Sequence, residues 1–74
     1  MTAITQSNQL YNTTVRKLLF ACMTENHKAC IKYGRELVDL AQVWNIPSLN
    51  NRLGKVYDYC KVANFGAVEC LLTS

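Results

Sequence analysis

The chain has 74 residues, of which 50% are hydrophobic and 18% are charged, and its formal net charge is +3. This composition excludes an intrinsically disordered chain, because disordered chains combine few apolar residues with a high net charge. The length allows a single helical domain, 1–74, whose core is small enough that self-association or a binding partner would add useful stability.

Three features of the sequence bear on the cellular compartment. The longest apolar run, 18–23, is far shorter than the roughly 20 residues that cross a membrane. The polar start of the chain lacks the cationic and apolar segments of a signal peptide. The cysteines lie within helix-like apolar patterns, which indicates reduced thiols in the core: Cys22, Cys30, Cys60 and Cys70. We therefore expect a cytoplasmic protein that does not enter a membrane.

The first predicted helix starts at Ser7 or Asn8, either of which can cap it, and ends near Met23. Residues 1–7 are then expected to form a flexible amino terminus. The apolar face of this helix carries Tyr11, Val15, Leu18 and Cys22. The polar segment 24–26 follows, and its threonine and asparagine can offer side-chain oxygens to the amides of the next helix. So short a break favours an antiparallel helical hairpin.

The second predicted helix, 29–44, has the clearest amphipathic pattern in the chain. Its apolar residues recur at intervals of three and four, as they do on one face of a helix: Cys30, Tyr33, Leu37, Leu40 and Trp44. Charged residues fall between or beside them. Pro47 stops this helix, since it disfavours helical geometry at Ile46 and suits the first turn of a new helix.

A third predicted helix begins near Pro47, and its apolar residues are again helically spaced: Leu49, Leu53, Val56, Tyr57 and Cys60. Gly66 offers a cap or turn after it, and 67–72 can form one last short helix. Alternating apolar and polar residues with hairpin signals do not occur, so no sheet is expected. The prediction is an all-α fold of three to four helices, an antiparallel hairpin plus a third helix.

A short segment of the third predicted helix resembles part of a known repeat. Residues 53–57 reproduce the Leu-Gly-x-x-Tyr portion of the first helix of a tetratricopeptide repeat. Arg16 and Lys17 stand where a preceding repeat would show leucine and glycine. The segment favours stacked antiparallel helices in a loosely tetratricopeptide-like arrangement.

The sequence predicts no catalytic, cofactor-binding or metal-binding site. Zinc ligands occur in pairs about two to four residues apart, whereas the cysteines here are spaced far more widely. Cys22 or Cys30 could use His27 as a base. A lone histidine and helix-buried thiols are more often structural, and the acidic residues are scattered among basic ones. We therefore expect a protein that is not an enzyme.

The basic residues make direct DNA binding an alternative. Lys28, Lys32 and Arg35 share one helix face, and such a face attracts phosphate in a salt-dependent way. Residues 40–53 loosely imitate a helix-turn-helix with a short turn. Its second helix would offer side chains that can contact bases: Asn50, Asn51, Arg52 and Lys55.

Aromatic residues near helix ends favour a protein-binding module instead. Trp44, Tyr59 and Phe65 lie at helix ends or off the main apolar stripes, where aromatic side chains often anchor interfaces. Together with three basic residues, they form the predicted partner-binding set: Arg35, Trp44, Arg52, Lys55, Tyr59 and Phe65.

The segment 21–60 resembles the small enteric regulators of the ANR and PerC-like groups and related short prophage proteins. The residues that carry the resemblance are Ala29 with Cys30, Tyr33, Leu37, Leu40 with Ala41, and Tyr59 with Cys60. The resemblance implies a non-enzymatic helical protein that binds a DNA-binding transcription factor and inhibits or modulates it, as an antirepressor or anti-activator. Homodimer formation is a further expectation. A phage inhibitor of a host defence enzyme is the third hypothesis.

Overall fold

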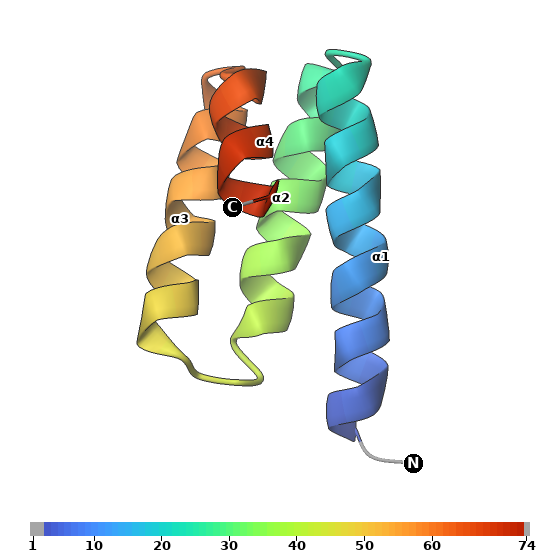
Figure 1. The fold of residues 1–74 in the computed structure, drawn as a ribbon, viewed down its shortest axis with the longest axis vertical. Helices are drawn as coiled ribbons and strands as arrows, with labels where there is room; N and C mark the ends of the chain where they lie inside the picture. Colours follow the sequence, from blue (N-terminus) through green and yellow to red (C-terminus); the bar gives the residue numbers. More distant parts are fainter. Residues whose placement is uncertain (1–2, 74) are drawn as a thin grey trace.

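The computed structural model describes residues 3–73, with side chains described from Gln9 onward. Within these residues the chain forms α-helices and no strand, which confirms the predicted all-α fold (Figure 1). The helices are α1 (Ala3–Met23), α2 (His27–Ala41), α3 (Pro47–Lys61) and α4 (Phe65–Thr73). None of the helices in this part of the chain combines the length and the apolar composition that a membrane-spanning helix needs.

The helices α1, α2 and α3 lie side by side and antiparallel, and α4 lies against α1 and α3 (Figure 1). Each consecutive pair packs together, and α4 also packs on α1, so the helices form a closed set. This closure does not confirm the tetratricopeptide-like arrangement, in which helices stack into an open array. The nine residues of α4 span about 13 Å, so α4 covers only the end of the molecule where α1 meets α2.

The core is built from apolar side chains of all four helices, most of them at helical spacing: Leu18, Ala21, Cys22, Cys30, Leu37, Ala41, Leu53, Val56, Cys60 and Val68. Thr14 is the buried polar residue beside them, and its hydroxyl donates a hydrogen bond of 2.8 Å to the carbonyl of Leu10. This bond offsets the cost of burying the hydroxyl.

The buried face of α2 consists of Cys30, Gly34, Leu37 and Ala41. Tyr33, Leu40 and Trp44, which were expected to share this face, are only half buried. Gly34 was not predicted there because it has no apolar side chain to count. A Cβ atom at Gly34 would lie 3.1 Å from Cys60 Sγ. The glycine therefore allows α2 and α3 to approach closely.

Several helix boundaries differ from the prediction: α2 begins at His27 and not at residue 29, and α4 covers Phe65–Thr73 and not only 67–72. α1 begins at Ala3, so residues 3–7 belong to a helix and not to a flexible terminus; Met1 and Thr2 lie outside the described residues. α2 ends at Ala41 and not at Trp44. Its last residues give way to a turn in which amides bond to carbonyls three residues earlier, as in the 3.1 Å bond from Trp44 N–H to Ala41 O. Tighter bonds of this kind are common where helices end.

In the connection between α1 and α2, the side chains of Thr24 and Asn26 form different hydrogen bonds. The side chain of Asn26 accepts a hydrogen bond of 3.2 Å from Ala29 N–H, which confirms its predicted role at the start of α2. The hydroxyl of Thr24 instead donates to the carbonyl of Phe20 at 3.0 Å. The predicted capping of α2 by Thr24 is therefore wrong, because the free carbonyls at the end of α1 lie nearer to its side chain.

A left-handed residue ends each of the first three helices. The φ angles are 54° at Glu25, 49° at Asn45 and 59° at Ala63. After α3, Asn64 N–H reaches back to Tyr59 O at 2.9 Å, a common way to satisfy the last carbonyls of a helix. Gly66 was expected to provide this turn, but it lies inside α4 and has no positive φ. The turn needs its left-handed residue just after the C-cap of α3, which is Val62, and that position is Ala63.

Candidate functional site

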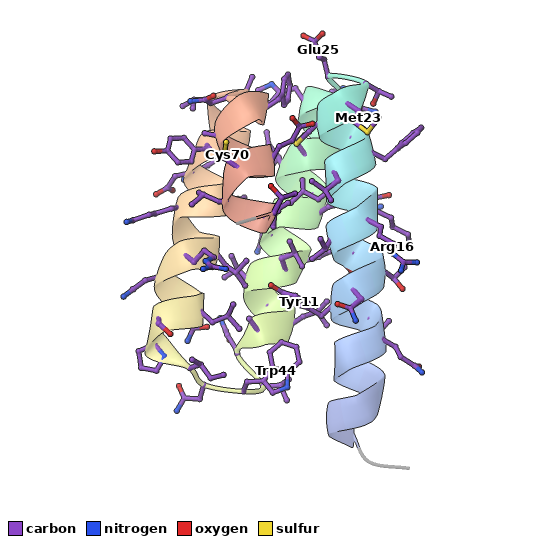
Figure 2. The ribbon with its side chains drawn as sticks, in the orientation of Figure 1. Tyr11, Arg16, Met23, Glu25, Trp44 and Cys70 are labelled. Atoms are coloured by element: carbon purple, nitrogen blue, oxygen red, sulfur yellow. The ribbon has the colours of Figure 1, made fainter. Side chains whose placement is uncertain are left out.

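The first candidate site lies at the end of the molecule that α4 does not cover. Tyr11 from α1 meets Trp44 from the α2–α3 connection (Figure 2), with ring centroids 5.3 Å apart and an interplanar angle of 77°. This edge-to-face geometry is the one that aromatic pairs prefer. The two rings help to line an open hollow of about 370 Å³, which we call the Tyr11 hollow: Tyr11, Asn12, Trp44, Ile46 and Leu49.

The Tyr11 hollow is apolar, and a positive charge stands beside it. Burial raises the pKa of Tyr11 above its ordinary value, and the nearby positive charge of Arg52 partly opposes this rise. The phenol therefore stays neutral near pH 7 and keeps its hydrogen as a donor. No acidic residue lines the hollow. The site can accept an apolar side chain and a negatively charged neighbour.

Apolar side chains continue outward from the Tyr11 hollow. Ile46, in its lining, is 45% exposed. Leu10 and Val43, which are next in sequence to Tyr11 and Trp44, are 56% and 58% exposed. Exposed apolar side chains near a hollow are a feature of interaction sites on small soluble proteins.

The structure brings together part of the predicted partner-binding set. Trp44 lines the Tyr11 hollow, and the positive charge of Arg52 acts on the phenol of Tyr11. Lys55 and Tyr59 follow Arg52 at intervals of three and four, so the three residues form an exposed row on α3, which we call the α3 row. Tyr59 is 38% exposed.

The other two predicted residues do not join this site. Arg35 is exposed midway along α2. Phe65 begins α4 and packs, half buried, against the core at the opposite end of α3 from the Tyr11 hollow. The sequence could not reveal this separation, because it depends on how α4 folds back over α3.

A second concave surface, between α1 and α2, was not predicted. It has a volume of about 330 Å³, and we call it the α1–α2 groove; its lining residues are Arg16, Lys17, Phe20, Ala21, Thr24, Asn26, Ala29 and Tyr33. Phe20 is 65% exposed. One signal in the sequence could have revealed it: Phe20 is a large apolar residue that lies off the predicted apolar face of α1.

Two ammonium groups lie over one aromatic ring of the α1–α2 groove. The Nζ atoms of Lys17 and Lys32 are 5.9 and 5.5 Å from the ring centroid of Tyr33. Each such cation–π contact is worth about 0.5–1 kcal/mol at an exposed site. Arg16 also lines the groove, and in Figure 2 it lies on the side of α1 turned away from α3 and α4. The contacts with Tyr33 thus keep the charges of Lys17 and Lys32 beside the apolar surface of the α1–α2 groove.

Three of the four thiols are buried in the core, one from each of α1, α2 and α3. The Sγ atoms of Cys22 and Cys30 are 3.6 Å apart. Burial raises the pKa of Cys22 and of Cys60 to about 12, and it also raises the pKa of Cys30. Because the thiolate is the reactive form, these thiols are poor nucleophiles and poor metal ligands near pH 7.

The remaining reactive residues are dispersed. Cys70 is exposed on α4, so its predicted place in the core is wrong (Figure 2). His27 Nε2 lies 3.0 Å from the carbonyl oxygen of Lys61, which links the start of α2 to the end of α3. Among the described residues, no three His, Cys, Asp or Glu side chains are arranged to hold a metal ion.

Comparisons with known proteins assign no family. No protein-family model matches the chain, and no curated protein or solved structure shows significant similarity to it. The resemblance to the ANR and PerC-like regulators therefore stays a prediction. The Tyr11 hollow and the α1–α2 groove are the features of the structure that indicate a function.

Proposed function

We propose that this chain is a small non-enzymatic regulator that binds a DNA-binding transcription factor in the cytoplasm and inhibits or modulates it. The observation that supports binding is the packing of Trp44 on Tyr11 at an open apolar hollow, beside Arg52. The few residues that supply most of the binding energy in protein interfaces are enriched in tryptophan, tyrosine and arginine. The transcription factor as partner rests on the resemblance of the segment 21–60.

The chemistry of the surface defines the partner further. The Tyr11 hollow would take one or two apolar side chains, and the cations of the α3 row would face carboxylates at the rim. Complementary charges at a rim increase the association rate and fix the orientation of the partner. The partner surface is therefore apolar at its centre and acidic at one edge.

The arrangement of α2 and α3 favours this proposal over direct reading of DNA. In a helix-turn-helix the two helices cross at about 90–120°. Here α2 and α3 lie antiparallel (Figure 1). Asn50, one of the residues expected to contact bases, is half buried. An inhibitor of a host defence enzyme would use the same surface and differs only in the partner.

The proposal is tested by affinity purification of the tagged chain from its native host, followed by mass spectrometry. We expect the wild-type chain to recover a transcription factor. The Trp44→Ala and Arg52→Glu variants should recover at least tenfold less, since each removes a residue of the type that dominates interfaces. Lys28→Glu serves as the matched control: it reverses the charge of an exposed residue that lines neither concave surface, and it should recover as much as the wild type.

Three outcomes would contradict the proposal. One is recovery of only a nuclease or of nothing. Another is unchanged recovery by folded Trp44→Ala and Arg52→Glu variants, with folding checked by circular dichroism. The third is a sequence-selective gel shift with genomic DNA at physiological salt, which would support DNA binding. Sedimentation of the purified chain measures the expected self-association independently.

A further inference from the structure

We propose that the α1–α2 groove is a second docking site, and that it binds an acidic peptide segment carrying an apolar anchor side chain. None of its lining residues lines the Tyr11 hollow or belongs to the α3 row. The inference therefore does not depend on the function proposed above. It rests on the shape, the charge and the aromatic contacts of the α1–α2 groove.

The shape of the α1–α2 groove suits an apolar side chain. Ala21 of α1 and Ala29 of α2 both line the groove, and their small side chains leave space there. Phe20 and Tyr33 provide aromatic surface beside them, and Phe20 is largely exposed. A leucine or aromatic side chain placed between these rings would remove their apolar surface from water.

The charged residues that line the α1–α2 groove are all positive. Arg16 and Lys17 line it, and Lys32 lies over the same tyrosine ring as Lys17. No carboxylate is among the lining residues, and the one ion pair within residues 3–73 joins Lys61 to Asp58 on α3. The capping residue of α2, Asn26, also lines the groove, so the positive end of the α2 dipole adds to the field.

The aromatic contacts favour a peptide over a nucleic acid. Proteins that bind single strands offer free aromatic faces on which bases stack, along a continuous basic track. Here the ring of Tyr33 already has the ammonium groups of Lys17 and Lys32 over it. A stacking base would have to displace them. A carboxylate would instead approach those ammonium groups without disturbing the ring.

The test is selection of a randomised displayed peptide library on the immobilised wild-type chain. We expect selected peptides to be enriched in aspartate and glutamate around one leucine or aromatic residue. A synthetic peptide of the enriched sequence, labelled with fluorescein, is then titrated by fluorescence anisotropy. Its affinity should fall at least tenfold for Arg16→Glu/Lys17→Glu, and it should also weaken as salt increases.

Two further variants keep the result interpretable. Arg16→Gln/Lys17→Gln removes the positive charges without introducing negative ones, and it should also weaken binding severalfold. Arg52→Glu/Lys55→Glu makes the same charge change on the α3 row, and it should bind the peptide like the wild type. Trp44→Ala, which should lose the transcription factor, should bind the peptide as tightly as the wild type. The two proposals can therefore fail separately.

Several results would overturn the inference. One is a selection that returns no acidic enrichment relative to the Arg16→Glu/Lys17→Glu chain. The enriched peptide could bind both charge variants of the α1–α2 groove as tightly as the wild type. A mixed-sequence single-stranded oligonucleotide that binds the wild-type chain more tightly than the peptide, and competes with it, would assign the groove to nucleic acid.

Discussion

The buried thiols link individual residues to the pH dependence of stability. Burial raises the pKa of Cys22 and of Cys60 from an ordinary value of 9.0 to about 12. Between these values the unfolded chain releases a proton that the folded chain keeps. The contribution of each thiol is therefore complete below pH 9.0 and is lost as the pH rises toward about 12.

We predict that alkylation with iodoacetamide at pH 8 modifies Cys70 first, because it is the exposed thiol. A thiol with a pKa of about 12 is ionised in roughly one molecule in ten thousand at that pH. Cys22 and Cys60 should therefore react only after urea is added, as followed by peptide mass mapping. Equal rates for Cys22 and Cys70 in the folded chain would show that the core thiols are accessible.

The raised pKa of Cys22 can be tested by comparing the pH dependence of stability of the wild-type chain with that of a variant that lacks this thiol. Above pH 9.0, each buried thiol lowers the free energy of unfolding by at most about 1.4 kcal/mol per pH unit. The stability difference between the wild-type chain and Cys22→Ala should then narrow between pH 9 and pH 11 in urea titrations. A difference that stays constant would contradict the raised pKa.

The helix ends depend on backbone conformation as well as on capping side chains. Ala63 adopts a φ of 59°, a left-handed conformation that costs a residue with a Cβ atom about 1–2 kcal/mol. Glycine adopts this conformation without that cost, which explains its frequency after helices. The end of α3 is thus strained at one residue, while the hydrogen bond from Asn64 to Tyr59 holds the turn.

We predict that Ala63→Gly raises the free energy of unfolding by about 1 kcal/mol, because relief of the left-handed strain exceeds the added chain entropy. Ala67→Gly is the matched control. Ala67 lies inside α4, where glycine should lower the stability by about 0.5–1 kcal/mol. Urea denaturation of both variants gives the comparison. A loss of stability in both would mean that Ala63 is not strained.

At the scale of single helices, the sequence predicts features that depend on neighbouring residues and misses features that depend on tertiary packing. Pro47 begins α3 and Asn26 caps α2, as their local chemistry requires. Gly34 was missed because its role is to admit Cys60 from another helix. The site shows the same division: Trp44 and Arg52 were predicted, whereas their meeting with Tyr11 requires α1 to lie beside the α2–α3 connection.

At the scale of the whole molecule, most packing joins helices that are consecutive in the chain. The contact between α4 and α1 is the exception, and it closes the set of helices. Val68, which is fully buried, anchors α4 in the core, and Leu37 lies at the centre of α2. Contacts between distant segments carry a larger loop-closure cost than contacts within hairpins.

We predict that Val68→Ala acts mainly on unfolding, because α4 docks on α1 after the hairpins have formed. A loss of about 2 kcal/mol should then increase the unfolding rate roughly thirtyfold and leave the folding rate nearly unchanged. Leu37→Ala should instead slow folding, since α2 packs on both α1 and α3. Stopped-flow measurements in urea separate the two rates. Slower folding of Val68→Ala would place α4 in the folding nucleus.

The short length of α4 also determines where the molecule opens. Amide exchange should be fastest near Leu10 and Val43, at the end that α4 leaves uncovered, and slowest around Leu18 and Cys30, which are buried in the core. The Tyr11 hollow thus lies on the least protected part of the fold. A partner that binds the Tyr11 hollow only while the surrounding helix ends are folded would lower the population of the locally unfolded state. This population would fall further as the ratio of partner concentration to Kd rises. Partner binding and the slowing of amide exchange at the Tyr11 hollow would then report on the same local folding equilibrium.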